Sequence, residues 1–315
     1  MNTLDYIKNV IRDEFKAIKE EVKESKPLAA TFILVIIGLL VYLKPFPDRH
    51  IYFLTGHTNS DWAVLADEAA SILNKNSLNF SVINTEGAVE NAMRLDNPGD
   101  KANAGFTYGL ALEASEIDGI YSLGSVSYDP VWILFNKNSV SEIKDLVDLS
   151  RYRVGLGPTH SGSYRIAKKI FNVVGVDVEG NPHFLSDSIS NIQSKLKKGD
   201  LDAVVIVSTN LDPTTKDLLK TPDIGVFDFK NASAFSKQIN SFVTLTLPVD
   251  SIDIKGHIPP KDVTLLATTT SLIVKRSMHP DLQLAILMAA KDANRNSPNL
   301  FFAQRDEFPA YRDPS

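Results

Sequence analysis

Two hydrophobic patterns follow one another along the chain. Over residues 3–25, apolar positions recur at three- and four-residue spacing, which predicts an amphipathic helix. From Ile51 onward, short apolar runs alternate with helical patterns as far as a long helix expected over residues 280–294. This alternation of strands and helices predicts an α/β protein with mainly parallel sheets.

The second pattern also predicts individual elements. Strands are expected at short apolar runs that end in turns, at residues 51–56, 80–87, 102–109, 120–137 (as two runs), 153–157, 202–208, 224–229 and 268–275. Helices are expected at residues 61–74, 88–95, 141–149 with Ser141 as cap, from the loop after Gly157 to about Val174, 189–199, from about Ala232, and 280–294.

A separate stretch, PLAATFILVIIGLLVYL at residues 27–43, carries no charge and lies between Lys26 and Lys44. At about 1.5 Å per residue it spans roughly 25 Å, which predicts an uncleaved transmembrane anchor. A cleaved signal peptide is the alternative. The long polar segment before residue 27 and the lack of an A-x-A-like site after Leu43 argue against it.

Basic residues set the expected orientation of this anchor. Six of them precede the apolar stretch, whereas only Lys44 and Arg49 follow it closely. We therefore expect a cytoplasmic amphipathic helix at 1–26, a single-pass inner-membrane anchor at 27–43, and a linker at 44–50. Residues 51–315 would then form a solute-binding domain in the periplasm or outside the cell.

Composition excludes several classes of function. The chain of 315 residues has a net charge of −5 and no cysteine, so it shows no basic nucleic-acid footprint, disulfide or thiolate chemistry. No two histidines have metal-ligand spacing, and no G-x-S-x-G motif occurs. We therefore expect a protein that is not an enzyme and that uses no cofactor or metal.

The loop GLGPTHSGSYRIAKKIF, residues 155–171, is the first candidate for ligand binding. Its glycine spacing is that of a nucleotide-binding P-loop, but Ser163 and Tyr164 stand where the Lys-Ser/Thr pair would be. The beginning of a helix still favours an anion, and Ser161 and Ser163 add hydroxyl donors. The alternative is an ordinary serine-capped connection.

Two further loops share this chemistry. NTEGAVENAMRL runs from a strand through Gly87 into a helix, and LTGHTNSDW ends the first strand with Thr55, Gly56, Asn59 and Ser60. Ligands of open α/β sheets bind at the carboxyl ends of strands, where such loops lie. The three loops together predict an anion site built of uncharged donors.

The chain resembles the TAXI family of TRAP-transporter solute receptors over about residues 50–300. The resemblance rests on TEGAVENAMRL, YDPVWILFNK, VGLGPTHSGSY, KKGDLDAVV and MHPDLQLAILMAA, in that order. It implies a two-lobe type II periplasmic binding protein fold that closes on a small carboxylate such as glutamate or a related acid. The family's turn before a helix matches Gly87, Ala88, Val89 and Asn91.

Two family features are matched less well. The Gly-Ser-Gly-Thr helix start corresponds only in part to Ser161, Gly162, Ser163 and Tyr164, and His57 and Asn59 replace paired glycines in the first loop. The resemblance also implies lobe one at about 51–128 and 246–315, lobe two at about 132–240, and hinges near Val131 and Phe242.

Side chains near the loops complete the candidate site. His160 and Arg165 are candidate partners for an anion, although both residue types are commonly solvated. Tyr108, Tyr128 and Trp132 are candidate walls, although aromatic residues in strands are mostly core. The expected ligand-binding residues are Thr55, Gly56, Asn59, Ser60, Gly87, Ala88, Asn91, Thr107, Tyr108, Trp132, His160, Ser161, Gly162, Ser163, Arg165 and Ser208.

The expected function is a membrane-anchored receptor that binds a glutamate-like acid or a dicarboxylate. The resemblance implies a TRAP membrane permease as its partner. The alternative is an anchored sensor that uses the same ligand-driven closure to signal through the N-terminal helix. We expect Asp202 to hold a turn rather than a ligand.

Overall fold

The computed structural model describes residues 11–19, 26–43, 49–58, 60–109, 118–140, 143–208, 213–239, 241–295, 302–303 and 306–310. The chain divides into two compact units, Met1–Asp48 and Arg49–Ser315, which are described separately. The predictions for residues 1–10, 20–25 and 44–48, and for Asn59 and Ser141, lie outside the described residues.

Two helical segments are described in the first unit. Residues 11–19 are helical, and Ile11, Phe15 and Ile18 on this segment are exposed. Helix α2 (Lys26–Leu43) contains the expected charge-free stretch and exposes large apolar side chains from Phe32 to Tyr42. In the part of the chain that the structure describes, no helix has both the length and the apolar character needed to cross a membrane, so the expected transmembrane span is not confirmed.

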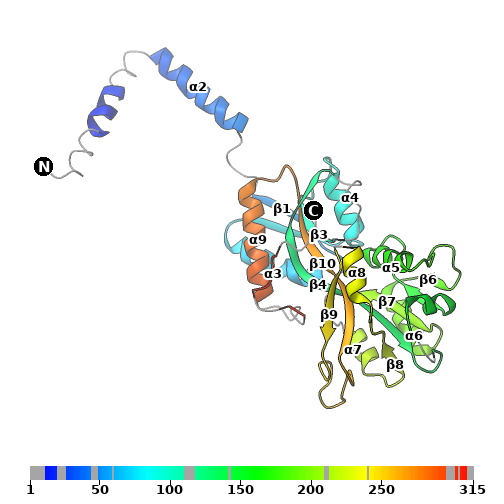
Figure 1. Ribbon diagram of the computed structural model, residues 1–315. Helices are drawn as coiled ribbons and strands as arrows, with labels where there is room; N and C mark the ends of the chain where they lie inside the picture. Colours follow the sequence, from blue (N-terminus) through cyan, green and yellow to red (C-terminus); the bar gives the residue numbers. More distant parts are fainter. Residues whose placement is uncertain are drawn as a thin grey trace. The chain divides into compact units, whose positions relative to one another are not determined.

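The strands that the structure describes in the second unit form one ten-stranded sheet (Figure 1). Its order is β2 (Asn79–Ile83), β1 (His50–Leu54), β3 (Ala104–Tyr108), β10 (Val263–Lys275), β4 (Ile120–Asn136), β7 (Ala203–Val207), β5 (Val154–Leu156) and β6 (Phe184–Ser186). In addition, β8 (Ile224–Val226) pairs with β4, and β9 (Val243–Leu247) pairs with β10.

Strands β4 and β10 are long and connect two halves of this unit (Figure 1). The half that holds β1, β2 and β3 with α3 (Asp61–Lys75), α4 (Ala88–Asp96) and α9 (Pro280–Arg295) is called lobe one. The half that holds β5 to β8 with α5 (Gly162–Val173), α6 (Ile189–Lys198), α7 (Pro213–Leu219) and α8 (Ala232–Gln238) is called lobe two. The lobe boundaries and hinges expected from the sequence stay predictions.

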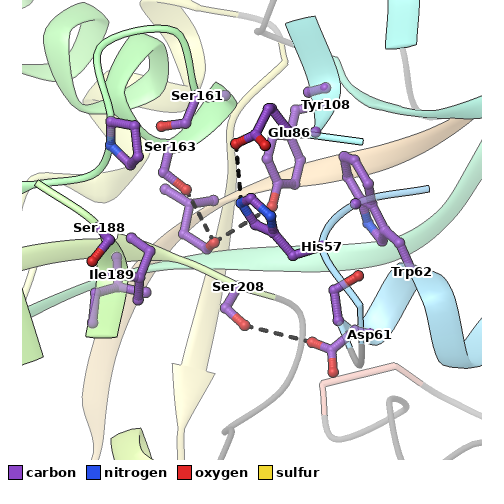
Figure 2. A pocket seen from close by; sticks show the side chains of 18 of the residues that line it. His57, Asp61, Trp62, Glu86, Tyr108, Ser161, Ser163, Ser188, Ile189 and Ser208 are labelled. Carbon is purple, nitrogen blue, oxygen red and sulfur yellow. Dashed lines mark hydrogen bonds and ion pairs between the residues drawn. The ribbon is translucent and has the colours of Figure 1, made fainter. Parts of the chain in front are cut away.

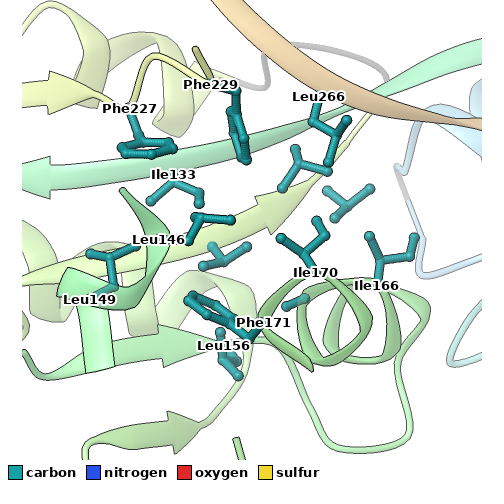
Figure 3. Packing of buried hydrophobic residues seen from close by; sticks show 14 of the residues in the cluster. Ile133, Leu146, Leu149, Leu156, Ile166, Ile170, Phe171, Phe227, Phe229 and Leu266 are labelled. Carbon is teal, nitrogen blue, oxygen red and sulfur yellow. The ribbon is translucent and has the colours of Figure 1, made fainter. Parts of the chain in front are cut away.

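Each lobe has its own hydrophobic core. In lobe one, Phe53, Phe106 and Leu65 pack between the sheet and helices α3 and α9. In lobe two, the core lies between β7, β4 and helix α5, and Figure 3 shows Phe171 and Ile170 of α5 facing Ile133 of β4. The two cores consist of different buried residues, and the partly buried Tyr108 packs against both.

The sequence did not predict β6, α7 or β9, and three further features differ from the expectation. The sheet is mixed rather than mainly parallel, because β4 and β10 run antiparallel to each other and to their neighbours β3, β7, β8 and β9. The two runs expected over 120–137 form one continuous strand. The helix expected over 141–149 is a short 3₁₀ helix, Leu146–Arg151, because Asp145 and Asp148 form a capping box that starts it later.

Candidate ligand-binding site

A cavity of about 500 Å³ lies between the two lobes. Lobe one contributes Gly56, His57, Ser60, Asp61, Trp62, Glu86, Gly87, Ala88 and Tyr108. Lobe two contributes Pro158, Ser161, Gly162, Ser163, Ser188, Ile189, Ser190, Ile206, Val207 and Ser208. Figure 2 shows the serines of lobe two facing His57, Asp61 and Trp62 across the cavity. A volume of this size suits a small molecule.

Four helices begin at this cavity, two from each lobe. Ser60, Ser161 and Ser188 are the caps of α3, α5 and α6, and the first helical residue of each also lines the cavity. Their hydroxyls accept hydrogen bonds from the backbone N–H groups of Ala63, Tyr164 and Asn191 at 3.3, 3.2 and 3.4 Å. The beginning of a helix carries partial positive charge, so four of them favour an anion in the space between them.

The fourth helix, α4, begins differently. Its cap is Gly87, whose backbone angles (φ 117°, ψ −152°) lie in a region that is essentially restricted to glycine. Among the described residues, no capping side chain accepts a hydrogen bond from the first turn of α4, whereas a serine does so at the other three helices. The backbone N–H groups of this turn are therefore the most available donors in the cavity.

The charged side chains of the cavity lining are mostly acidic. Asp61 and Glu86 are carboxylates, His57 is the one residue of basic type, and neither lysine nor arginine occurs in the lining as far as the structure describes it. His57 Nε2 lies 3.7 Å from Glu86 Oε2, and both side chains are well exposed. Ser208 of lobe two donates to Asp61 Oδ2 at 3.5 Å, which links the two lobes (Figure 2).

Aromatic rings form the inner wall on the side of lobe one. The rings of Trp62 and Tyr108 lie 4.8 Å apart, and the Tyr108 hydroxyl donates to the carbonyl of Val207 in lobe two at 3.4 Å. Burial raises the pKa of Tyr108 well above its ordinary value, and the charges of Asp129 and Asp61 add to this effect. Tyr108 therefore remains a neutral hydrogen-bond donor at physiological pH.

A buried chain of hydrogen bonds holds Trp62 in place. Its indole N–H donates to Thr270 Oγ1 at 2.9 Å, and Thr270 in turn donates to Asp129 Oδ2 at 2.7 Å. Asp129 and Thr270 lie on β4 and β10, the two strands that connect the lobes. The aromatic wall is thus fixed to the connecting strands.

Nine of the ligand-binding residues expected from the sequence line this cavity. They are Gly56, Ser60, Gly87, Ala88, Tyr108, Ser161, Gly162, Ser163 and Ser208. Each lies in, or at the edge of, a strand-to-helix loop, except Tyr108 and Ser208, which lie at the ends of β3 and β7. The topology therefore brings together residues that are up to 152 positions apart between Gly56 and Ser208.

The other expected residues that the structure describes do not line it. Asn91, Thr55 and Thr107 are buried because they hold the backbone around the loops: Asn91 donates to the carbonyl of Thr55, and Thr107 donates to the carbonyl of Ala88. Trp132 is 1% exposed and packs in a hydrophobic cluster of lobe two that also contains Ile192 and Leu196. Tyr128, weighed as a wall, packs against Phe308 instead.

Two charged candidates also lie elsewhere. His160 lines a separate hollow beside α4, together with Glu90 and Arg94. Arg165 is not part of the cavity lining. Asp202 accepts hydrogen bonds from the backbone and side chain of Arg153, so it holds a turn, as expected.

Several lining residues were not expected from the sequence, namely His57, Asp61, Trp62, Glu86, Pro158, Ser188, Ile189, Ser190, Ile206 and Val207. Ser188 carried a usable signal, because it follows a strand and caps the next helix in the same way as Ser161. Strand β6 was not predicted, so this fourth strand-to-helix loop was missed. Asp61 and Glu86 carried no signal, since acidic residues are common both in first helical turns and in loops.

Comparison with known proteins identifies related sequences and folds. The sequence model of the NMT1-like family matches residues 53–295 of this chain. No curated protein matches the chain. The periplasmic aliphatic sulphonate binding protein SsuA from Escherichia coli has a similar structure, with 13% identity and a TM-score of 0.50 over 78% of this chain and 72% of its own.

Two further solved structures have similar folds. One, described as a periplasmic transporter, is 10% identical with a TM-score of 0.52 and covers 84% of this chain and 91% of its own. The other, from Bordetella bronchiseptica, is 15% identical with a TM-score of 0.52 and covers 79% and 71%. At these identities the likeness is one of fold, which by itself does not define a ligand.

Proposed function

Because this chain belongs to the NMT1-like family, we propose that it is a solute receptor whose two lobes hold a small anionic ligand between them. The observation that carries this proposal is the convergence of four helix beginnings, two from each lobe, on one cavity of about 500 Å³. Such helix ends stabilise an anion without a charged side chain. The E. coli neighbour is itself named for binding an anionic sulphonate.

Within this proposal, the acidic side chains favour a particular kind of anion. A dicarboxylate would bring two negative charges next to Asp61 and Glu86, and the described lining offers no lysine or arginine to offset them. A glutamate-like amino acid brings an ammonium group that pairs with a carboxylate. We therefore favour an amino acid over a dicarboxylate, with its carboxylate at the helix beginnings and its amine near Asp61.

The proposal also includes a partner protein and a location in the cell. The resemblance to the TAXI receptors supports delivery of the ligand to a TRAP membrane permease. The exposed apolar side chains of α2, from Phe32 to Tyr42, support attachment of the chain to a membrane with the binding unit outside the cytoplasm. Fractionation of cells expressing the native chain tests this: recovery from the soluble fraction would contradict it.

A thermal-unfolding screen of the full chain in mild detergent tests ligand binding. L-glutamate, glutarate, succinate, butane-1-sulphonate and acetate would be compared at equal concentrations. A ligand at about 100 times its dissociation constant adds roughly 2.7 kcal/mol to the free energy of unfolding, which is a readily measured shift. We expect L-glutamate to give the largest shift and acetate the smallest. If none of the larger anions shifts the transition, the proposal is wrong.

A further inference from the structure

Gly162, the first residue of α5, faces the opposite lobe. A Cβ atom added at this position would lie 2.5 Å from Cδ2 and 2.9 Å from Cε2 of Tyr108, and 3.0 Å from Cβ of Ala88. Tyr108 and Ala88 belong to β3 and α4 of lobe one. The space for a side chain at residue 162 is thus occupied by the other lobe.

The backbone of lobe two does not itself require glycine here. Gly87, Gly124, Gly175 and Gly199 have positive φ values, whereas Gly162 does not. Gly162 begins a regular helix after the cap Ser161, a position that alanine adopts readily. The reason for glycine at this position therefore comes from the contact between the lobes.

The ring of Tyr108 is not free to move aside. It packs against the ring of Trp62 at 4.8 Å, and its hydroxyl bonds to the carbonyl of Val207. It also contacts the hydrophobic cores of both lobes. A methyl group at residue 162 must therefore displace α5 from lobe one, because protein interiors tolerate added volume poorly.

We propose that Gly162 sets how far the two lobes close, and that any side chain at this position holds the cavity open. The proposal rests on the two-lobe receptor function proposed above. The absence of a side chain lets the beginning of α5 come up against the beginning of α4, so that both helices reach one ligand. Gly162 is a positioning residue, since it acts through the contact of Ala88 and Tyr108 with its own backbone.

Disulfide trapping of the ligand-free full chain tests this. The chain has no cysteine, so the paired substitutions Asp61→Cys and Ser208→Cys, whose native side chains approach to 3.5 Å across the lobes, create a single possible disulfide. The rate of its formation with a fixed concentration of oxidant reports how often the lobes close. Adding Gly162→Ala is expected to slow this rate at least about tenfold, from the usual range of overpacking penalties.

Two further variants make the result specific. Adding Tyr108→Ala to the Gly162→Ala background removes the obstructing ring and is expected to restore the rate to within about threefold of the parent. Gly157→Ala is the matched control, because its added methyl group would meet Ser161 and Ile189 of its own lobe. It should leave the rate within about threefold. An equal slowing by Gly157→Ala would contradict the proposal.

Thermal unfolding separates a role in closure from a role in folding. Gly162→Ala should leave the melting temperature unchanged or raise it, since alanine favours helix more than glycine does. A trapping rate equal to that of the parent overturns the proposal, and so does a lowered melting temperature in both Gly162→Ala and Gly162→Ser. No ligand is used here, so failure of the ligand screen with the native chain would leave this result unaffected.

Discussion

Asn91 donates a hydrogen bond of 2.6 Å from its side-chain amide to the backbone carbonyl of Thr55. The same amide donates to the carbonyl of Phe106 at 2.8 Å, and its oxygen accepts from the hydroxyl of Thr85 at 2.6 Å. One fully buried side chain on α4 therefore joins the end of β1, the middle of β3 and the loop after β2. These are the backbone segments from which lobe one contributes its part of the cavity.

Replacing Asn91 with alanine should strongly destabilise the protein. The carbonyls of Thr55 and Phe106 would each lose a buried hydrogen bond, and such losses are costly even though the Thr85 hydroxyl also donates to the Thr55 carbonyl at 2.8 Å. We expect a loss of about 2–4 kcal/mol in the free energy of unfolding, measured by urea titration. The control is Asn172→Ala on the exposed face of α5, which should change stability by less than about 0.5 kcal/mol. Equal stability of the two variants would contradict this role.

The contrast between Asn91 and Ser161 shows how much of the site the sequence could predict. Ser161 caps α5 and lines the cavity. Its position before a helical pattern predicted the cap, and its place in one of three similar strand-to-helix loops predicted the cavity. Asn91 was expected to contact the ligand because it matches the turn before a helix in the TAXI receptors that the chain resembles. Whether a side chain on α4 points to the cavity or to the strands depends on packing against β3, which one sequence does not specify.

In the fold, too, the sequence predicts local elements but not the packing between distant ones. Alternating strand and helix patterns predicted the α/β class and most strands of both lobes. They did not predict that β10 lies between β3 and β4, because the pairing of distant strands depends on contacts across more than 140 residues, such as Thr270 with Ser127. The acidic lining of the cavity could not be predicted for the same reason: Asp61 and Glu86 come together only once α3 and α4 pack on one sheet.

The ion pair of Asp202 and Arg153, in a turn far from the cavity, should make the stability of the protein depend on pH. Hydrogen bonding by the Arg153 side chain lowers the pKa of Asp202 below its ordinary value, although burial opposes this. The ionised form is therefore stabilised by folding. Its contribution is fully present above the unfolded-state pKa of about 3.9 and is lost as the pH falls through the lower folded-state pKa.

Substitution of Asp202 by asparagine should therefore cost about 1–3 kcal/mol of unfolding free energy at pH 7. The difference between the variant and the native chain should shrink as the pH is lowered below about 4. Urea titrations at several pH values measure both. Asp223→Asn at an exposed position should cost little at either end of the range. A pH-independent cost at residue 202 would show that the charge is not responsible.

A negative charge placed at the cap of α5 should weaken ligand binding while changing the stability of the fold little. Ser161→Asp keeps a good cap at a helix beginning, so stability should change by less than about 1 kcal/mol. The new carboxylate enters the proposed anion site and should weaken the best anion of the screen at least tenfold, measured by calorimetry. Ser161→Asn, which has nearly the same shape and no charge, should bind within about threefold. Equal affinities of the two variants would remove this loop from the site.

Substitution of Asp61, one of the two acidic residues in the cavity lining, should change the ligand preference. Asp61 lies at the beginning of α3, lines the cavity and accepts a hydrogen bond from Ser208. If it pairs with the ammonium group of an amino acid, then Asp61→Asn should weaken L-glutamate but not glutarate, which has the same two carboxylates and no amine. Removing the repulsion between Asp61 and a dianion should even strengthen glutarate.

We therefore expect the ratio of the L-glutamate and glutarate affinities to fall at least tenfold in Asp61→Asn, as measured by calorimetry on the full chain. The folded state should lose no more than about 1 kcal/mol, because Asp61 also interacts favourably with the beginning of its helix. Asp67→Asn, on the exposed face of the same helix, is the matched control and should leave the ratio unchanged. Parallel weakening of both ligands in Asp61→Asn would instead mean that this carboxylate supports the closed arrangement of the lobes through Ser208 and does not select the amine.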